Sequence, residues 1–448
     1  MKQLSLFPEW EISPSPNNNI NNINDAERQR IEQKFLPLMR EELRLGQLVS
    51  YVGNKSLPIL RLYRYKEAFS FALVKEFIHR FKLTEDDYLF EPFCGMGTTL
   101  FTSMQHNIPS IGIDRLPIAT FVANTLPLFL SIEPKTLRQT FVLLKSKVAK
   151  AEPAEVAWDV AIMKTAFPED TLLLLRQWKG AINTLSYPLK DIFLFLFLSI
   201  LEPCSYTAKD GQFLRLKQDK IIPDPSDILE GKVYEAEQDI LSLHYLWGKK
   251  GNHYFPNVCS GDARDLSSIH FQQAPTALIT SPPYANRYDY TRTYSLELCF
   301  QFVRNFEQLK ELRFGILRSH IESKIEAEEK PNHPVIQEIV EILKQQGKVL
   351  NNPRIPNMLT AYFIDMAKVI SEWSKVLASG AKVAIVVDNV RFEGEMVPVD
   401  LVLSEMAELV GFKVEEIIIA RYKGNSSQQM GKYGRVPVRE SIVVWQKQ

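Results

Sequence analysis

The chain has 448 residues, a length that predicts two or three domains or one large domain with an insertion. Hydrophobic residues make up 45% and charged residues 24%, which excludes a mainly disordered, collagen-like or coiled-coil protein. Because 53 Lys and Arg residues balance 53 Asp and Glu residues, a uniformly basic nucleic-acid coat protein is excluded, whereas an enzyme with one basic face is not. The four cysteines have no C-x-x-C spacing, so we expect no metal site, no disulfide framework and a reducing compartment.

The N-terminal region lacks the apolar core of a signal peptide, and the strongest apolar run, residues 192–201, covers about half of a membrane span. We therefore expect a cytoplasmic protein without a membrane partner. Residues 11–24 are rich in Ser, Pro and Asn, and residues 1–24 are interpreted as a disordered tail.

Residues 25–120 predict N-terminal helices followed by the first half of an α/β sheet. A short strand leads into a glycine-containing turn, a helix and a second strand that ends at Asp114. This order is the opening unit of a doubly wound sheet. The expected elements are helices over 25–48 and 69–81 and strands over 87–90 and 110–113.

Residues 121–255 interrupt the alternation and predict a helical insertion that contains a basic loop at 209–220. The second half of the sheet is expected over 256–448, with a helical segment at 296–356. No helix separates the final two strands, so they should pair as an antiparallel hairpin. The predicted fold class is α/β, a seven-stranded Rossmann-like sheet with that hairpin and the insertion. The remaining strands are expected at 257–263, 277–280, 382–387, 413–419 and 441–445, and helices at 358–377 and 399–409.

Three strand ends carry residues suited to a nucleotide-like ligand. Gly95 and Gly97 follow the first strand and allow the backbone to approach a ligand, although a tight turn without a ligand has the same pattern. Asp114 can accept hydrogen bonds from ribose hydroxyls or cap a helix. Asp262, after the third strand, can accept from an adenine amine or belong to an ordinary turn.

The sharpest motif is Ser281-Pro282-Pro283-Tyr284, directly after the fourth strand. Two consecutive prolines fix φ twice and leave their carbonyls free as acceptors in a rigid arch. A hydroxyl precedes the arch and an aromatic ring follows it. This set suits a planar group that bears an NH₂, because oxygens accept from the amine while Tyr284 stacks on the ring.

These elements, in this order, resemble the S-adenosylmethionine-dependent amino-methyltransferases of DNA. The resemblance covers residues 60–120 and 257–447 and leaves the insertion unmatched. The family's cofactor turn, D-P-F-x-G-x-G-T, corresponds to residues 91–98, with Glu in place of Asp, and its catalytic tetrapeptide, [DNS]-P-P-[YFW], is matched in full. The resemblance implies a methyltransferase sheet, S-adenosylmethionine as cofactor and no metal. It implies catalytic roles for Ser281, Pro282, Pro283 and Tyr284, and cofactor contacts from Phe69, Ser70, Glu91, Phe93, Gly95, Gly97, Thr98, Asp114 and Asp262.

Two basic segments are candidates for DNA contact. The loop from Arg421 to Arg439 contains five basic residues and no acid, which suits phosphate contacts, although a solvated hairpin has the same composition. The loop at 209–220, within the possible recognition region 121–255, mixes bases with acids. The candidate DNA-binding residues are Lys209, Arg215, Arg421, Lys423, Lys432, Arg435 and Arg439.

The expected reaction is methyl transfer to the exocyclic N4 amine of cytosine in double-stranded DNA, with the base flipped out of the duplex. In the family that the chain resembles, Ser at the first place of the tetrapeptide usually accompanies cytosine, and Asp or Asn adenine. N6-adenine methylation is the alternative, and methylation of RNA or of a protein amide is a second. A cognate restriction endonuclease is a possible partner.

Other functions account for fewer of the motifs. A nicotinamide dehydrogenase gives no role to Ser281–Tyr284, and the intact tetrapeptide argues against an inactive recognition subunit. Pro203-Cys204 matches the nucleophile of the carbon-5 cytosine enzymes but lies in the predicted insertion. Three charged residues beyond the tetrapeptide are interpreted as helix-start charges and loop anchors rather than catalytic groups: Asp289, Arg292 and Glu297.

Overall fold

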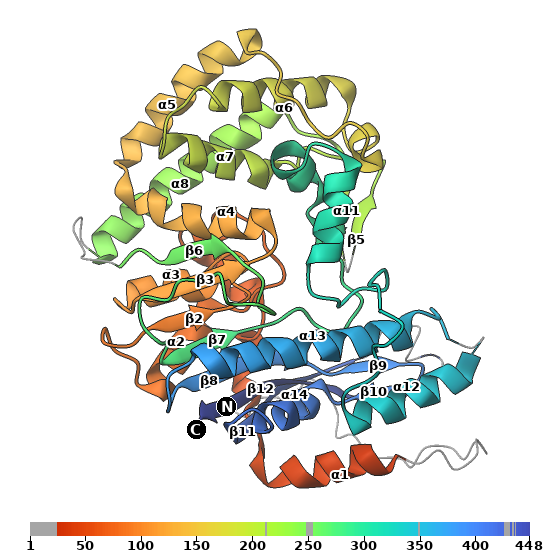
Figure 1. Ribbon diagram of the computed structural model, residues 1–448. Coiled ribbons are helices and arrows are strands. Elements are labelled where there is room, and N and C mark those ends of the chain that lie inside the picture. Colours follow the sequence, from red (N-terminus) through yellow and green to blue (C-terminus); the bar gives the residue numbers. More distant parts are fainter. Residues whose placement is uncertain are drawn as a thin grey trace, which may run out of the picture.

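The computed structural model describes residues 25–448 apart from 211–212, 248–253, 348–349, 425–430, 432–433 and 435. Within this part of the chain, eight strands form one sheet in the order β1-β11-β12-β8-β7-β2-β3-β6 (Figure 1). β12 is antiparallel to both of its neighbours, and all other pairs are parallel. The strands are β1 (Met39–Glu41), β11 (Phe412–Lys423), β12 (Val438–Lys447), β8 (Lys382–Asp388), β7 (Ala277–Thr280), β2 (Leu89–Glu91), β3 (Ser110–Asp114) and β6 (Asn257–Ser260).

The strand order places a switch point between β2 and β7. From β2 the chain moves outward to β3 and β6, and then it returns to β7 on the other side of β2 and continues to β8. In open α/β sheets ligands bind at such a point, outside the carboxyl ends of the strands. The glycine turn follows β2 and the Pro-Pro tetrapeptide follows β7, so both lie there.

Helices cover both faces of the sheet because neighbouring strand residues point in opposite directions. Leu89 and Ile279 pack in the layer of α2, whereas Phe90 and Leu278 pack in the layer of α12, α13 and α14. The helices of this half are α1 (Ala26–Phe35), α2 (Phe71–Phe81), α3 (Thr98–Gln105), α12 (Pro334–Gln346), α13 (Ile355–Val376) and α14 (Val399–Glu408).

A helical lobe, defined as α5 to α8, lies beyond the β6 edge of the sheet and is joined to it by α4 (Pro117–Thr125) (Figure 1). Every residue from Ile192 to Leu198 in α7 is buried, so the strongest apolar run of the sequence is the core of this lobe. None of the described helices is both long and apolar enough to span a membrane. The lobe helices are α5 (Pro134–Lys147), α6 (Glu169–Ile182), α7 (Leu189–Ile200) and α8 (Pro225–Trp247).

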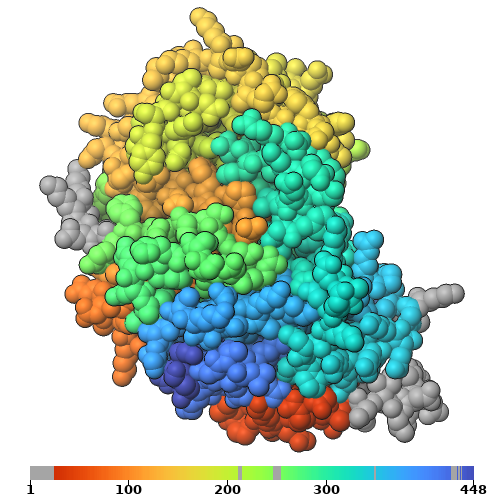
Figure 2. All heavy atoms as spheres, viewed as in Figure 1, coloured from red at the N-terminus to blue at the C-terminus, as the bar shows by residue number. Residues whose placement is uncertain are grey.

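The segment after the tetrapeptide returns from the lobe to the sheet. It contains α11 and α12 and forms a continuous surface band, teal in Figure 2, that extends from the helical lobe to α1. Its further helices are α9 (Tyr290–Thr293), α10 (Ser295–Glu297), the π-helix η8 (Leu298–Phe302) and α11 (Phe306–Gly315). The 3₁₀ helices are η1 (Leu36–Leu38), η2 (Leu43–Gln47), η3 (Tyr51–Ser56), η4 (Leu60–Leu62), η5 (Leu126–Ser131), η6 (Val148–Lys150) and η7 (Ala161–Lys164).

The predicted α/β sheet with a final antiparallel hairpin is confirmed, but the single helix expected over 25–48 is wrong. Pro37 cannot continue an α-helix, and α1 ends at Phe35. The chain then adds β1 to the free edge of β11 as an eighth strand. At Gly46 a Cβ would lie 2.8 Å from the carbonyl oxygen of Ala420, so only glycine allows this close return to the sheet.

Two small hairpins were not predicted. β4 (Thr207–Asp210) and β5 (Phe213–Leu216) form an antiparallel pair inside the segment expected to be a basic loop. β9 (Val390–Phe392) and β10 (Glu395–Val397) form another after β8. Each strand of these ribbons has only three or four residues. So short a stretch of alternating polar and apolar residues cannot be distinguished from a loop in the sequence.

Arg439, predicted to contact DNA, is part of the folded core instead. Its guanidinium pairs with Asp400, which has no exposed surface, and with Glu32 of α1. The Ser441 hydroxyl donates a 2.7 Å hydrogen bond to the same carboxylate of Asp400. This ion pair fastens β12 to α14 and α1, and so it is not available to a phosphate.

We expect Arg439→Met to lower the free energy of unfolding by about 3 kcal/mol, because it leaves the buried Asp400 carboxylate without its cation. Urea unfolding measures the change. Adding Asp400→Asn to that variant should restore part of the loss, since the unpaired charge is then removed. An unchanged urea midpoint for Arg439→Met would contradict the structural role.

Candidate active site

The turn after β2 has a conformation that requires glycine. Gly97 has φ +82° and is the N-cap residue of α3, and a Cβ there would lie 2.8 Å from Cβ of Ala123. Gly95 has φ +49°. The turn is closed by a 2.7 Å hydrogen bond from the Gly97 N–H to the Cys94 carbonyl. It thereby presents backbone groups at the carboxyl edge of the sheet.

Asp114, at the end of β3, holds this turn in place. Its carboxylate accepts hydrogen bonds from the Gly95 N–H at 3.0 Å and from the Leu116 N–H at 2.8 Å. Burial raises the pKa of Asp114 to about 6, although these backbone donors act in the opposite direction. The carboxylate also lines a cavity beside the turn, where its remaining lone pairs can accept from a ligand.

This first cavity joins residues from four strand ends and contains many of the predicted cofactor and catalytic residues. Sequence reasoning missed several others, which lie only a few residues along the chain from predicted ones but whose residue types form no motif of their own. Predicted residues in the lining are Phe93, Gly95, Asp114, Asp262, Ser281 and Pro283, and missed ones are Tyr65, Glu67, Arg115, Arg264 and Tyr290.

Asp262 is paired within the protein. Arg264 holds it through two hydrogen bonds, Nε to Oδ1 at 2.9 Å and Nη2 to Oδ2 at 2.8 Å. Burial alone would raise the pKa of Asp262, but the hydrogen bonds and charge of Arg264 lower it below the usual value. A ligand amine at this end of the cavity would therefore share the carboxylate with Arg264.

Glu91 lies behind the cavity, contrary to the prediction that it contacts the cofactor. It is 2% exposed and accepts hydrogen bonds from Thr99, at 2.7 Å, from the Phe93 N–H, at 3.2 Å, and from the Thr280 hydroxyl. Burial raises its pKa to about 8. Its contacts join the turn after β2 to the end of β7.

Four other predicted cofactor residues also lie outside the first cavity: Ser70, Gly97 and Thr98, which belong to the turn or its support, and Phe69, which lines a second cavity. Ser70 is buried and caps α2 by accepting from the Leu73 N–H at 3.2 Å. Thr98 is buried at the start of α3. The amide of buried Asn54, which the sequence did not indicate, lies 3.0 Å from the Phe69 carbonyl and 3.3 Å from Thr98 Oγ1. These residues support the turn from behind.

Three members of the tetrapeptide, Ser281, Pro282 and Tyr284, line a second cavity of about 230 Å³ together with Phe69. The Ser281 hydroxyl lies 3.2 Å from the Val386 carbonyl and 3.3 Å from the Tyr284 hydroxyl, and its one proton can be donated to either of them, while its lone pairs can accept from a ligand. The hydroxyl of Tyr284 donates to Glu440 at 3.3 Å. The volume is several times the roughly 30 Å³ of one water molecule, so the cavity can hold a small ring.

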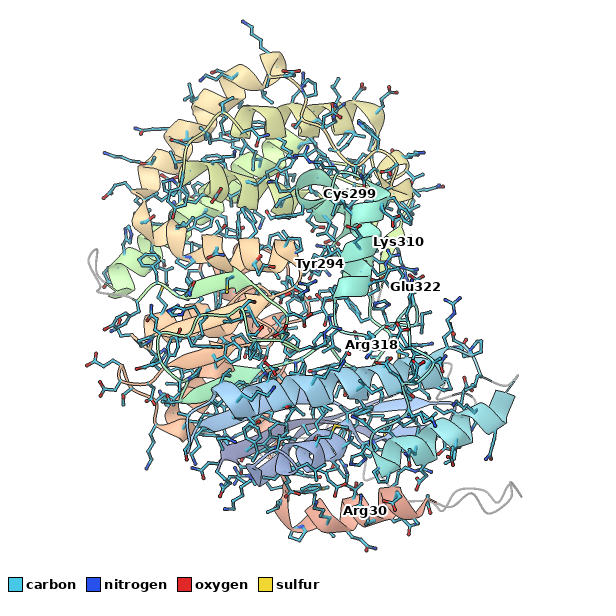
Figure 3. The ribbon with its side chains drawn as sticks, viewed as in Figure 1. Arg30, Tyr294, Cys299, Lys310, Arg318 and Glu322 are labelled. Carbon is cyan, nitrogen blue, oxygen red and sulfur yellow. The ribbon has the colours of Figure 1, made fainter. Side chains whose placement is uncertain are left out.

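The two cavities meet at three residues that line both of them, Ser281, Glu67 and Tyr290. Glu67 is held there by the hydroxyls of Tyr288 and Tyr294. Tyr294 lies between the helical lobe and the sheet (Figure 3) and stacks on Tyr65 with 4.8 Å between ring centroids. Two ligands bound in the two cavities would therefore meet beside the Ser281 hydroxyl.

The predicted DNA-binding residues are dispersed. Lys209 is 4% exposed, pairs with Glu297 and lies 4.2 Å from the ring centroid of Tyr294, so the prediction of a phosphate contact is corrected. Arg215 is exposed on β5. Arg421 and Lys423 line the second cavity. Lys432 and Arg435 lie outside the described residues.

Structural contacts account for three residues that were not expected to be catalytic: Cys204, Asp289 and Arg292. Cys204 is fully buried, and burial raises the pKa of its thiol to about 12, which does not suit a nucleophile. Asp289 caps α9 by accepting from the Thr291 N–H at 2.9 Å, and Arg292 pairs with Glu322. Among the described residues, no group of three metal-ligating side chains is placed to hold a metal ion.

Comparison with known proteins identifies the family. The chain is 34% identical to the type II methyltransferase M.BsoBI of Geobacillus stearothermophilus, over 98% of this chain and 95% of that protein. It is also 34% identical to the type II methyltransferase M.AvaI of Nostoc sp., over 93% and 92% of the two chains. No family model matches the sequence.

Two solved structures resemble the chain remotely. TrmN from Thermus thermophilus has a TM-score of 0.29 and 9% identity, with 84% of this chain and 49% of that one covered. The rRNA methyltransferase aviRa from Streptomyces viridochromogenes has a TM-score of 0.32 and 12% identity, with 84% and 85% covered. The relatives that match over nearly their full length decide the assignment: the chain belongs to the type II methyltransferases, and S-adenosylmethionine is its methyl donor.

Proposed function

We propose that this protein is a site-specific DNA methyltransferase that methylates the exocyclic N4 amine of cytosine in double-stranded DNA. The observation that carries the proposal is the position of Ser281 at the junction of the two cavities. We further propose that it acts in the cytoplasm beside a cognate restriction endonuclease.

The residues of the first cavity suit S-adenosylmethionine. Asp114 would accept hydrogen bonds from the ribose hydroxyls, and Asp262 from the adenine amine, which it would share with Arg264. The carboxylate of Glu67, at the junction, complements a cationic group on the donor. Phe93 and Gly95 would line the site, while Gly97, Thr98, Glu91 and Ser70 keep the turn in shape. The cofactor supplies a methyl group on a positively charged sulfur that leaves as a neutral thioether.

The tetrapeptide would hold the target amine beside this methyl group. Flipping the base costs a few kcal/mol, and stacking on Tyr284 would offset about 1–3 kcal/mol of that cost. The Ser281 hydroxyl and the Pro282 carbonyl would accept the two amine hydrogens and turn the nitrogen lone pair toward the methyl carbon. Pro283 stiffens the arch. No covalent intermediate is needed, because the amine nitrogen would bond directly to the methyl carbon while the electron pair of the broken C–S bond stays on sulfur, and the methylated amine would then release one proton to solvent. Positioning supplies most of the rate.

DNA would be held outside these cavities. We propose that residues 121–255 form the recognition region, with the exposed Arg215 of β5 as a backbone contact. Lys432 and Arg435, on the other basic segment, stay candidates for the same task.

We expect the affinity for S-adenosylmethionine to decrease as the pH is lowered through about 6, because a protonated Asp114 is a poorer acceptor for ribose hydroxyls. The affinity should be constant above that range. Asp114→Asn should lower the affinity at pH 8 by at least about tenfold, or 1.4 kcal/mol, and flatten the pH profile. Calorimetry measures both, and a folded variant with wild-type affinity would refute the role.

We expect Tyr284→Ala to abolish most turnover and to leave cofactor affinity nearly intact, because its ring faces the second cavity. Tyr284→Phe is the matched control: it keeps the stacking surface and removes the hydroxyl's hydrogen bonds with Glu440 and Ser281, so most turnover should survive. Single-turnover kinetics at saturating cofactor provide the test. Loss of cofactor affinity together with normal turnover would reverse the assignment.

The product should be N4-methylcytosine. Duplex DNA methylated with labelled cofactor, digested to nucleosides and separated by chromatography identifies the modified base. Sequencing modified bases in DNA from cells that express the chain identifies the site. Label in N6-methyl-2′-deoxyadenosine would support the adenine alternative, and a protein active only on RNA would contradict the choice of DNA.

A further inference from the structure

We propose that Lys423 reads the extruded base itself, by donating a hydrogen bond to the ring nitrogen next to the target amine, and does not contact the DNA backbone. This inference rests on the proposed function as a methyltransferase of a base amine. It assigns a specificity-determining residue to the second cavity, and it changes the role expected for the basic hairpin.

Strand alternation separates the basic residues of the β11–β12 hairpin. Arg421 lies opposite Glu440, Tyr422 opposite Arg439, and Lys423 opposite Val438. Because side chains alternate between the two faces of a sheet, Arg421 and Lys423 share one face, and Tyr422 and Arg439 share the other. The first pair lines the second cavity, whereas Arg439 packs against Asp400.

Buried carboxylates fix Lys423 in position. Its ammonium lies 2.8 Å from Glu440 Oε1 and 3.0 Å from Asp388 Oδ2. Glu440, which is 2% exposed, also pairs with Arg421 and accepts from the Tyr284 hydroxyl. A lysine has three N–H donors, so these two pairs leave one donor for a ligand.

The same ammonium lies 5.8 Å from the ring centroid of Tyr284, the residue on which the base would stack. A base on that ring would have its hydrogen-bonding edge near both Ser281 and Lys423, since all three residues line one cavity. The amine would meet the acceptors of the tetrapeptide, and the adjacent ring nitrogen, which is an acceptor, would meet the ammonium. That nitrogen is N3 in cytosine and N1 in adenine.

The charge balance of the cavity argues against a phosphate at this place. Among the residues that the structure describes, three carboxylates and three cations line the cavity, so this lining offers an anion no excess positive charge, and a phosphate at Lys423 would be close to two carboxylates. A neutral base is compatible with this balance. The charged residues of the lining are Glu67, Asp388 and Glu440, and Lys66, Arg421 and Lys423.

The test compares Lys423→Met with the wild-type enzyme on the duplex site found by sequencing modified bases. We expect turnover at saturating DNA and cofactor to decrease at least tenfold, cofactor affinity to stay within twofold, and the salt dependence of DNA binding to stay unchanged. A phosphate contact would instead reduce the log–log salt slope by about 0.9. Lys413→Met, at the exposed far end of the same strand, is the matched control and should change none of these quantities.

A second substrate isolates the hydrogen bond. A duplex with 3-deaza-2′-deoxycytidine at the target position keeps the amine and lacks the N3 acceptor. Its penalty in turnover relative to cytosine should be at least tenfold smaller in Lys423→Met than in the wild type, as in a double-mutant cycle. An equal penalty in both enzymes, normal turnover of Lys423→Met or a reduced salt slope would overturn the inference.

Two further outcomes are distinguishable. If the wild type methylates adenine, the same cycle uses 1-deaza-2′-deoxyadenosine, whereas a wild type that methylates no DNA base refutes the proposed function and not only the role of Lys423.

If Lys423→Met does not fold, Lys423→Arg keeps the charge for Glu440 and moves the donor. It should then change the deaza penalty, and an unchanged penalty would overturn the inference.

Discussion

The buried carboxyl group of Glu91 joins the two halves of the active site. It lies at the end of β2, and its hydrogen bonds reach Thr99 at the start of α3 and Thr280 at the end of β7. The cofactor turn and the catalytic tetrapeptide therefore have a common fixed point, and a shift of one strand would move both. Burial raises the pKa of Glu91 to about 8 and so favours the neutral carboxyl group over an unpaired charge at the centre of the fold. The amino-methyltransferase family that the sequence resembles has Asp at this position. The additional methylene of Glu91 lengthens the side chain that connects the ends of β2 and β7.

Transfer between two ligands requires that they meet at one place, and the junction of the cavities provides it. Ser281 belongs to both cavities because it is the first residue after β7, next to the switch point of the sheet. Its hydroxyl has two acceptors within reach, the Val386 carbonyl of β8 and the Tyr284 hydroxyl, so the orientation of its lone pairs is set by the neighbouring strand and by the tetrapeptide itself. The chemistry thus depends on strand order, because only adjacent carboxyl ends place these groups within a few ångströms.

Motifs that depend on local backbone chemistry could be predicted from the sequence. The glycine turn, Asp114 and Ser281–Tyr284 follow strands whose order is a general property of doubly wound sheets, and their convergence follows from that order. Roles that depend on a distant partner could not be predicted. Lys209 was expected to contact DNA because it is basic, but its partner, Glu297, is far away in the sequence and buries it.

In the basic hairpin, such a partner lies one residue beyond the end of the basic segment. The segment from Arg421 to Arg439 contains no acid, yet the next residue is Glu440, which antiparallel pairing places directly opposite Arg421. Composition alone groups the five cations of this segment into one basic surface. The alternation of side chains along the strands instead places Arg421 and Lys423 at the second cavity and Arg439 against Asp400. The same pairing that neutralises these cations also leaves Lys423 rigid beside Tyr284, and rigid donors are what recognition of one base edge requires. Attraction of the DNA backbone must therefore come from other cations, and this separates the residues that hold the duplex from those that select the base.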